Sequence, residues 1–244
     1  PYRYYKFTDS REHQHAFEMF KDYKGNIMAD GYGAYQTLDE DPQYDCALHC
    51  CWAHVRRKFI ESSDGDLVLR DRMLLLITRL YRWEKLYWKT SAREERRKIR
   101  EKKMEPLIDA IFSEAKHAFL EGNILPKSKL YKALQYMLKR EVYLRRFLEN
   151  EDMRIDNNTA ERALRPIAIG RKNWLFAGSI RGGEATATLM TIIQSCRAMN
   201  VDPNAYLKII LNKIQTYPAS RIDELLPHHY MGIPHKQLQE KAAA

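Results

Sequence analysis

The sequence predicts an α/β protein in which helices greatly outnumber strands. Two short runs rich in apolar residues, at 27–29 and 45–51, have the length of buried strands. Residues 62–150, in contrast, contain almost no glycine and alternate charged with apolar residues at the helical period. Short strands followed by a long helical segment indicate a mixed fold that carries a large helical insertion.

The composition indicates a globular protein with a basic surface. Hydrophobic residues make up 45% of the 244 positions, enough for one or two domains with a sizeable core. The formal net charge of +9 favours a polyanionic partner, although many proteins with basic surfaces share it. No run of 18 apolar residues and no signal peptide is found, so we expect no membrane span. Three cysteines crowd together and the fourth is distant, which is no disulfide framework and fits a reducing cytoplasm.

The first carboxylate of interest follows the earlier apolar run. Asp30 comes directly after residues 27–29, and Gly31 and Gly33 allow a tight turn there. A carboxylate at the end of a buried strand can be held rigidly at a cleft, as a metal site requires. The same position is typical of an Asx-turn or a helix N-cap, so both interpretations stay open. Upstream, the aromatic residues of the segment 2–7 predict a further strand.

Residues 45–59, DCALHCCWAHVRRKF, predict a buried strand followed by the start of a helix. His49, Cys50, Cys51 and His54 invite a zinc interpretation, which we discount. Adjacent cysteines seldom bind one tetrahedral ion, and no second ligand pair lies at finger spacing. His54 is either a capping histidine at the edge of the core or part of a basic helix start that faces phosphates.

The segment 62–150 predicts three or four antiparallel helices. One apolar face recurs at helical spacing through Met73, Leu76, Ile77, Leu80, Trp83 and Tyr87. Ser91 and Glu94 match a capping box, Pro106 suits the first position of a new helix, and Ser128 suits the N-cap of the next. That last helix would bury Leu130, Leu134, Met137 and Leu138. The basic run at 93–103 is either a solvated helix face or a contact to the DNA backbone.

The stretch 153–184 concentrates charged and amide side chains. Asp156, Asn157 and Asn158 suit a helix start, and an apolar stripe follows at Ala160, Ala163, Leu164 and Ile167. Glu161 lies off this stripe beside Arg162 and Arg165. An acid between guanidinium groups can hold a metal and clamp a phosphate, or form an ordinary ion pair along a solvated helix.

The C-terminal part predicts two further helices. Gly182 and Gly183 suggest a turn, after which Glu184 would start a helix that runs to about Met199. Asp202 would cap a final helix, with a proline at its first position.

Taken as a whole, several of these stretches resemble one protein family. DNNTAERALRPIAIGRKNWLFAGS at 156–179 closely resembles the signature of bacterial transposases of the insertion sequence 66 family, which belong to the DDE class. DGYGAY at 30–35 and CWAHVRRKF at 51–59 are similar to two further motifs of that family, and RIDELLP at 221–227 is similar to its C-terminal segment.

The resemblance implies an RNase H-like core, truncated at its N-terminal strand, with a large all-helical insertion and a helical C-terminal segment. The expected divisions are residues 1–61 for the first part of the core, 62–150 for the insertion, 151–180 for the Glu-bearing helix and 181–244 for the C-terminal segment. In the family, Asp30 matches the second metal-binding carboxylate and Glu161 the third. The first would lie upstream of the aromatic strand, so we expect a fragment that lacks full catalytic competence.

The resemblance also implies an activity and its partners. We expect metal-dependent DNA strand cleavage and strand transfer of an insertion element with two Mg²⁺ ions, or Mn²⁺ in their place. The partners would be DNA, both element ends and target, and further copies of the chain assembled on it. The location would be the cytoplasm, at the nucleoid. The side chains expected at DNA are His54, Arg57, Asn157, Asn158, Arg162, Arg165, Arg171 and Lys172. Trp174 would stack on a base or pack in the core.

Two other classes of function remain open at this point. The chain could be a non-enzymatic, basic DNA-binding remnant or regulator of a decayed element. It could also be a helix-rich nuclease with another substrate, such as RNA. The presence of both Asp30 and Glu161 favours the transposase over the regulator.

Overall fold

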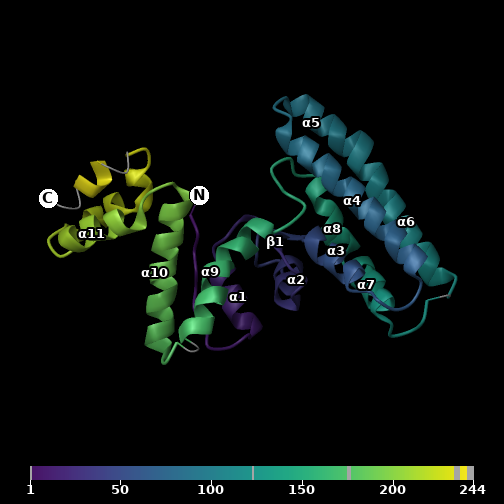
Figure 1. The fold of residues 1–244 in the computed structure, drawn as a ribbon, viewed down its shortest axis with the longest axis horizontal. Helices are drawn as coiled ribbons and strands as arrows, with labels where there is room; N and C mark the ends of the chain where they lie inside the picture. Colours follow the sequence, from purple (N-terminus) through teal and green to yellow (C-terminus); the bar gives the residue numbers. More distant parts are fainter. Residues whose placement is uncertain (1, 123, 175–176, 234–236, 241–244) are drawn as a thin grey trace. The chain divides into compact units, whose positions relative to one another are not determined.

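We describe the protein from a computed structural model that covers residues 2–122, 124–174, 177–233 and 237–240, with only the backbone at 171–174. The chain forms two compact units. One comprises Pro1–Arg11 with Glu161–Ala244, and the other comprises Glu12–Ala160. The position of one unit relative to the other is not determined (Figure 1).

The unit of residues 12–160 contains a small parallel sheet. Strand β1 (Gly25–Ala29) pairs with β2 (Cys46–Cys50), with Gly25 opposite Cys46 and Ala29 opposite Cys50. Helix α2 (Gly33–Glu40) connects them, as parallel strands require a crossover, and α1 (His13–Phe20) precedes β1. Both predicted buried strands are thus confirmed, and both carboxyl ends lie at the same edge of the sheet.

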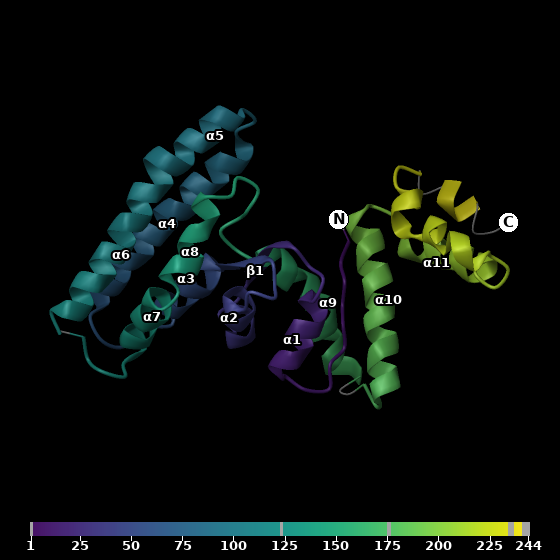
Figure 2. The same cartoon turned by 180° about the vertical axis from the view of Figure 1, so that it is seen from behind.

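Helices make up the rest of this unit. They are α3 (Trp52–Ile60), α4 (Leu67–Lys89), α5 (Arg93–Ile99), the π-helical turn η1 (Arg100–Met104), α6 (Glu105–Leu120), α7 (Lys129–Leu138), α8 (Glu141–Arg145) and the 3-10 turn η2 (Arg146–Leu148). Figures 1 and 2 show α4 and α6 side by side along most of their length. Helices α3, α7 and α8 lie between this pair and the sheet in both views.

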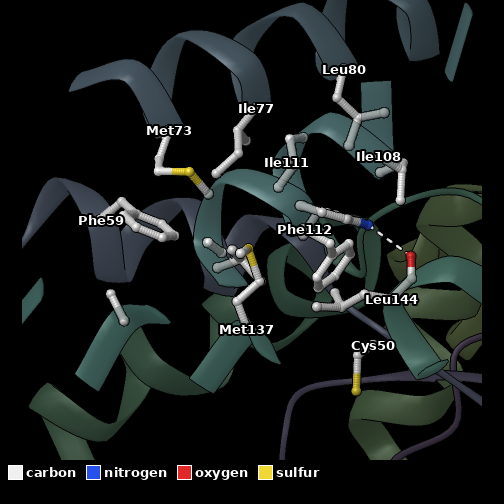
Figure 3. Packing of buried hydrophobic residues seen from close by; sticks show 14 of the residues in the cluster. Cys50, Phe59, Met73, Ile77, Leu80, Ile108, Ile111, Phe112, Met137 and Leu144 are labelled. Atoms are coloured by element: carbon white, nitrogen blue, oxygen red, sulfur yellow. Dashed lines mark hydrogen bonds between the residues drawn. The ribbon is translucent and has the colours of Figure 1, made fainter. Parts of the chain in front are cut away.

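The core of this unit is formed largely by the stripes that the sequence predicts. Met73, Ile77, Leu80 and Tyr87 of α4 are fully buried, and Leu76 and Trp83 are partly buried. Figure 3 shows α4 residues above Phe59, Phe112 and Met137, which come from α3, α6 and α7. Leu130 and Leu134 are also fully buried, while Leu138 is partly buried.

Two local predictions in the helical segment, at Ser128 and Pro106, are confirmed and one, at Ser91, is wrong. Ser128 accepts the N–H of Tyr131 at 3.0 Å and caps α7 as expected. Ser91 does not cap α5, whose N-cap is Ala92. Pro106 lies in the first turn of α6 as predicted, although α5, η1 and α6 follow one another without a break. The π-helical turn before the proline shifts the hydrogen-bond register there, so the missing N–H leaves the run unbroken.

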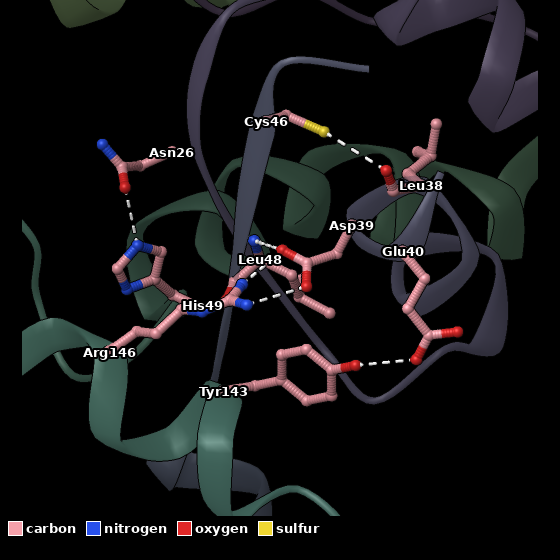
Figure 4. A network of polar contacts seen from close by, with 9 residues as sticks. All are labelled: Asn26, Leu38, Asp39, Glu40, Cys46, Leu48, His49, Tyr143 and Arg146. Carbon is pink, nitrogen blue, oxygen red and sulfur yellow. Dashed lines mark hydrogen bonds and ion pairs between the residues drawn. The ribbon is translucent and has the colours of Figure 1, made fainter. Parts of the chain in front are cut away.

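A polar network fastens α2 and α8 to β2 (Figure 4). Asp39 accepts the backbone N–H of Leu48 at 2.7 Å and both terminal nitrogens of Arg146. Arg146 also donates to the carbonyl of Leu48 at 3.0 Å. Tyr143 donates to Glu40 at 3.1 Å nearby. The network satisfies a buried carboxylate with a guanidinium partner and a backbone donor, as a charge in a low-dielectric interior requires.

The second unit is helical in the part that the structure describes. It contains most of α9 (Asn158–Trp174), then α10 (Ile180–Ala198), α11 (Pro203–Lys213) and the 3-10 turns η3 (Ala219–Leu225) and η4 (Pro227–Tyr230). Asp202 caps α11 through Asn204 N–H at 2.9 Å, as predicted. Helix α10 starts at Ile180 rather than at Glu184, because Ser179 caps it through the N–H of Gly182 at 3.0 Å.

The N-terminal segment 2–7 lies against α10 and is not a strand. The N–H of Arg3 donates to the Ser195 hydroxyl at 3.0 Å, and the N–H of Tyr5 donates to the Thr191 hydroxyl at 3.0 Å. The predicted strand is therefore wrong. A strand needs a neighbouring strand for its backbone groups, and here side-chain hydroxyls of a helix supply partners instead.

The observed class is α/β, mostly helical, with one two-stranded parallel sheet in the described residues. An RNase H-like core stays a prediction. Among the helices that the structure describes, none is long and apolar enough to cross a membrane.

Candidate functional site

Asp30 lies where the sequence places it, directly after β1 at the carboxyl edge of the sheet. Its side chain is exposed, and Oδ1 accepts the N–H of Tyr32 at 3.1 Å. This Asx-turn leads into α2, so the structural role proposed for the residue is present. The turn also orients the carboxylate, because one of its oxygens is tied to the backbone.

Arg140, the N-cap residue of α8, holds the same turn. The sequence did not predict this role. Its Nη2 donates to the carbonyl of Gly31 at 2.8 Å, and its guanidinium lies 4.1 Å from the centre of the Tyr136 ring. A Cβ atom at position 31 would overlap both groups, so a side chain there would force the ends of Arg140 and Tyr136 to move. Arg140 is 109 residues away from Gly31 in sequence. No motif or periodicity indicates a contact over that separation.

Two ionisable groups near Asp30, the Cys50 thiol and the Tyr136 hydroxyl, are neutral at pH 7. Burial raises the pKa of the Cys50 thiol to about 12, and Asp30 adds to the effect. Burial likewise raises the pKa of Tyr136 to about 12. A protonated thiol is a poor metal ligand, so the groups at this edge favour a hard cation bound by carboxylate oxygen over zinc.

The start of α9 is attached to the same edge of the sheet. Trp52 N–H donates to the carbonyl of Ile155 at 2.9 Å, and Asn157 N–H donates to Cys51 Sγ at 3.5 Å. Cys51 follows β2 directly, just as Asp30 follows β1. Because parallel strands end at a common edge, the first residues of α9 and Asp30 belong to one edge of one unit.

Buried polar groups of the helical segment hold the loop before α9. Glu84 Oε1 accepts the N–H of Ile155 at 3.3 Å and the indole N–H of Trp88 at 2.6 Å. Arg100 donates to the carbonyls of Asn150 and Met153 and lies 4.2 Å from the centre of the Tyr87 ring. Burial raises the pKa of Glu84, which favours its neutral form. No local sequence signal indicates this support, because the bonded groups are 50 to 71 residues apart.

A polar pocket opens between α3 and α4, beside the start of α9. Its volume is about 440 Å³. The lining residues are Ala53, Arg56, Arg57, Ile60, Thr78, Tyr81 and Asn158. The structure therefore brings together Arg57 and Asn158, two of the side chains predicted to contact DNA. His54 is half-buried on the same helix, and Asn157 directly precedes α9.

Three more predicted residues lie on the first two turns of α9. Glu161 is half-buried, while Arg162 and Arg165 are exposed. The predicted apolar stripe is wrong in part, because Leu164 is 54% exposed and Ala160 is exposed as well. Glu161 opens the second unit, so the structure defines no distance from its carboxylate to that of Asp30. The side chains of Arg171, Lys172 and Trp174 lie outside the described residues.

Comparison with known proteins decides the family. A model described as "Transposase IS66 family" matches residues 1–185, and one described as "IS66 C-terminal element" matches residues 191–228. The chain belongs to the IS66 transposase family. The resemblance that the motifs around Asp30, His54 and Glu161 carry is thereby confirmed.

The curated relatives of this IS66 family chain carry no stated activity. The uncharacterized proteins y4qI and y4hP of Sinorhizobium fredii (strain NBRC 101917 / NGR234) are 34% and 33% identical to it. The alignments cover 93% and 92% of this chain but 43% of each relative. The chain therefore spans less than half the length of these relatives. No solved structure matches it.

Within the described part of this IS66 chain, no three His, Cys, Asp or Glu side chains form a group that could hold a metal. Asp30 and Glu161 are carboxylates, and carboxylate oxygens are hard ligands of the kind that Mg²⁺ and Mn²⁺ prefer.

Proposed function

We propose that the chain is part of a DDE-class transposase and supplies two metal-binding carboxylates, Asp30 and Glu161, of an RNase H-like nuclease core. The main support for the proposal is that Asp30 and the loop before α9 lie at a common edge of the sheet. Asp30 follows β1, and the loop that starts α9 is bonded to residues that follow β2. Glu161 comes three residues after Asn158 on that helix, close in sequence to the attachment point.

Each group has a defined part in the proposed chemistry. Bound Mg²⁺ ions would activate the nucleophile and stabilise the leaving oxygen during strand cleavage and transfer. Asp30 and Glu161 would hold them, and the Arg140 contact to Gly31 keeps the Asp30 turn in place. Arg162 and Arg165 would bind substrate phosphates, as guanidinium groups do in bidentate fashion. His54, Arg57, Asn157, Asn158, Arg171 and Lys172 complete the proposed DNA contacts. The proposed partners are element ends, target DNA and further copies of the chain, at the nucleoid in the cytoplasm.

Metal binding tests the proposal directly. We expect residues 1–244 to bind Mn²⁺ in a calorimetric titration, and Asp30→Asn and Glu161→Gln each to weaken binding at least about tenfold, because each removes one charged ligand. Asp22→Asn is the matched control for the first variant, since Asp22 is exposed and precedes β1. Glu184→Gln is the control for the second, on the first turns of α10.

Two outcomes would contradict the metal proposal. One is Mn²⁺ binding that survives both Asp30→Asn and Glu161→Gln. The other is equal loss in Asp22→Asn and Glu184→Gln. A strand-transfer assay with Mg²⁺ or Mn²⁺ completes the test, and robust activity of residues 1–244 would show that two carboxylates suffice. DNA binding without metal binding would favour the non-enzymatic regulator instead.

A further inference from the structure

The pocket between α3 and α4, referred to here as the Arg56 pocket, lies entirely within the unit of residues 12–160. Its seven lining residues, given above, include two arginines, three neutral polar side chains and no carboxylate. A cavity of about 440 Å³ with this lining is suited to an anion larger than chloride. Two of its lining residues, Arg57 and Asn158, are among the proposed DNA contacts, whereas Arg56 has no role in the function proposed above.

The strongest evidence for an anion site is the Arg56 guanidinium, which has no counter-ion within the described part of the chain. Arg56 is exposed and makes no hydrogen bond or ion pair with any residue that the structure describes. Several other arginines of the unit are neutralised by carboxylates, among them Arg72 by Glu114 and Arg93 by Glu151. An arginine without an internal counter-ion in a cavity has its forked donors available for a ligand, and phosphate oxygens match that fork.

The other walls of the pocket also favour a negative ligand. Asn158, which lines the pocket, is the first residue of α9, and the first residues of a helix carry backbone N–H groups that favour an anion. Burial raises the pKa of Tyr81, so its hydroxyl keeps its proton. The Asp156 carboxylate lies beside Tyr81, but Asp156 is not in the lining and its Oδ1 accepts the N–H of Asn158 at 3.1 Å.

The surface next to the pocket indicates where such a phosphate belongs. Arg82 and Lys85 follow Thr78 and Tyr81 by four residues each, so they extend the same face of α4 by one turn. Both are exposed. A single small anion would need the pocket alone, whereas a chain of phosphates would also meet these two cations.

We propose that the Arg56 pocket binds one phosphate group of a DNA backbone, with Arg56 and Arg57 as its main ligands. This inference rests on the proposed function, since it assumes a DNA substrate. Asn158 connects the two sites, because it lines the pocket and begins the helix that carries Glu161. A strand anchored here would lie at the start of α9, three residues before Glu161 in the chain.

The test compares the salt dependence of DNA binding between variants of residues 1–244. Fluorescence anisotropy with a labelled 20-mer duplex at several KCl concentrations gives the slope of log K against log [KCl]. Arg56→Gln should reduce the magnitude of this slope by about 1, because one phosphate contact is lost. Arg56→Lys should keep the slope while weakening affinity, because it keeps the charge but not the fork. Arg79→Gln is the matched control, an exposed arginine of α4 outside the lining, and should change the slope less.

A second variant separates binding from folding. Asn158→Asp places a carboxylate in the pocket, yet aspartate is as good a residue as asparagine at a helix start. We expect an unchanged or higher Tm together with DNA binding weakened roughly tenfold, the cost of one repelled phosphate. A lower Tm with unchanged DNA affinity would show that Asn158 has a structural role only, and would overturn the proposal.

The remaining outcomes are distinguishable. Equal slope changes in Arg56→Gln and Arg79→Gln would show that DNA responds to the overall positive charge of the surface. That result would overturn the proposal that the pocket binds a phosphate. Calorimetry with inorganic phosphate provides the other source of the same chemistry. If Arg56→Gln abolishes inorganic phosphate binding but leaves the DNA slope unchanged, the pocket serves a free anion and the DNA assignment is wrong. If the wild-type chain binds no DNA, both the proposed function and the assignment of the pocket to DNA are wrong, whereas DNA binding that Arg56→Gln leaves unchanged overturns the pocket alone.

Discussion

At the scale of single residues, the unit of residues 12–160 depends on buried polar side chains with partners far away in sequence. His49 of β2 is 2% exposed, and its Nε2 donates to Asn26 Oδ1 at 2.7 Å. Its Nδ1 is buried and has no hydrogen-bond partner in the described residues. Burial and the nearby Arg146 guanidinium lower the pKa of His49 to about 4, so the ring is neutral in the folded protein.

The low pKa of His49 predicts a loss of stability in mild acid. Below pH 6.5 an unfolded chain takes up a proton at this ring, whereas the folded chain does not until about pH 4. The free energy of unfolding therefore falls by about 3 kcal/mol in total as the pH drops from 6.5 to 4. His49→Gln, whose amide can still donate to Asn26, should lose that much less stability over the same range in urea unfolding measured at each pH.

A second histidine provides the control for this measurement. His117 is exposed on α6, where it faces Glu121, so His117→Gln is the control for the same substitution at an exposed ring. A His49→Gln profile parallel to the wild type between pH 6.5 and 4 would show that the ring is not buried in its neutral form.

At the scale of elements, the extended segment 2–7 and helix α10 depend on each other. The segment donates two backbone N–H groups to hydroxyls of α10, and the Tyr5 hydroxyl donates to the carbonyl of Ala163 on α9. Phe7 packs directly on Gly183, where a Cβ atom would approach the ring to about 2.5 Å. Glycine at the start of α10 therefore serves close packing rather than the turn that the sequence predicts.

Gly183→Ala should loosen this attachment. The added methyl overlaps the Phe7 ring, and overpacking of this kind costs about 1–3 kcal/mol. We expect a lower Tm and faster hydrogen exchange of the Arg3 and Tyr5 amides, measured by NMR. Gly33→Ala is the control, because a Cβ atom at that position meets nothing within 4 Å and alanine favours the helix that begins there. Unchanged exchange at Arg3 and Tyr5 would contradict the packing described here.

At the scale of the whole molecule, the dominant feature is the net charge of +9. Ion pairs within the described residues neutralise part of the positive charge, as in Arg145 with Asp109 and Lys116 with Glu141. The remaining cations include those of the Arg56 pocket and the exposed residues of α4 that extend it. A protein with this charge attracts nucleic acid of any sequence, because the attraction is to phosphates.

We expect residues 1–244 to bind unrelated duplexes with similar affinities. The affinity should fall steeply when KCl is raised from 50 to 200 mM, by about tenfold or more if two or more phosphates are neutralised. Anisotropy titrations with two duplexes of different sequence measure both quantities. Affinity that does not change with salt would rule out a phosphate-based contact, whatever its location.

Much of the local structure could be predicted, because it depends on interactions between residues that are close in sequence. The strand before Asp30, the buried face of α4 and the caps at Ser128 and Asp202 depend on neighbours within a few residues. Predictions failed where a distant group took part. The backbone N–H groups of segment 2–7 bond to hydroxyls of α10 instead of to a neighbouring strand.

By itself the sequence determined the family, through motifs that are continuous along the chain, and the order of strands and helices, through periodicity. The tertiary structure alone decided that Arg140 holds the turn after Asp30, that Glu84 and Arg100 hold the loop before α9, and that Arg56 faces a cavity with Asn158. The physical reason is that hydrogen bonds and charges act between groups close in space. Folding brings such groups together across separations of 50 to 109 residues, and linear spacing contains no record of those pairs.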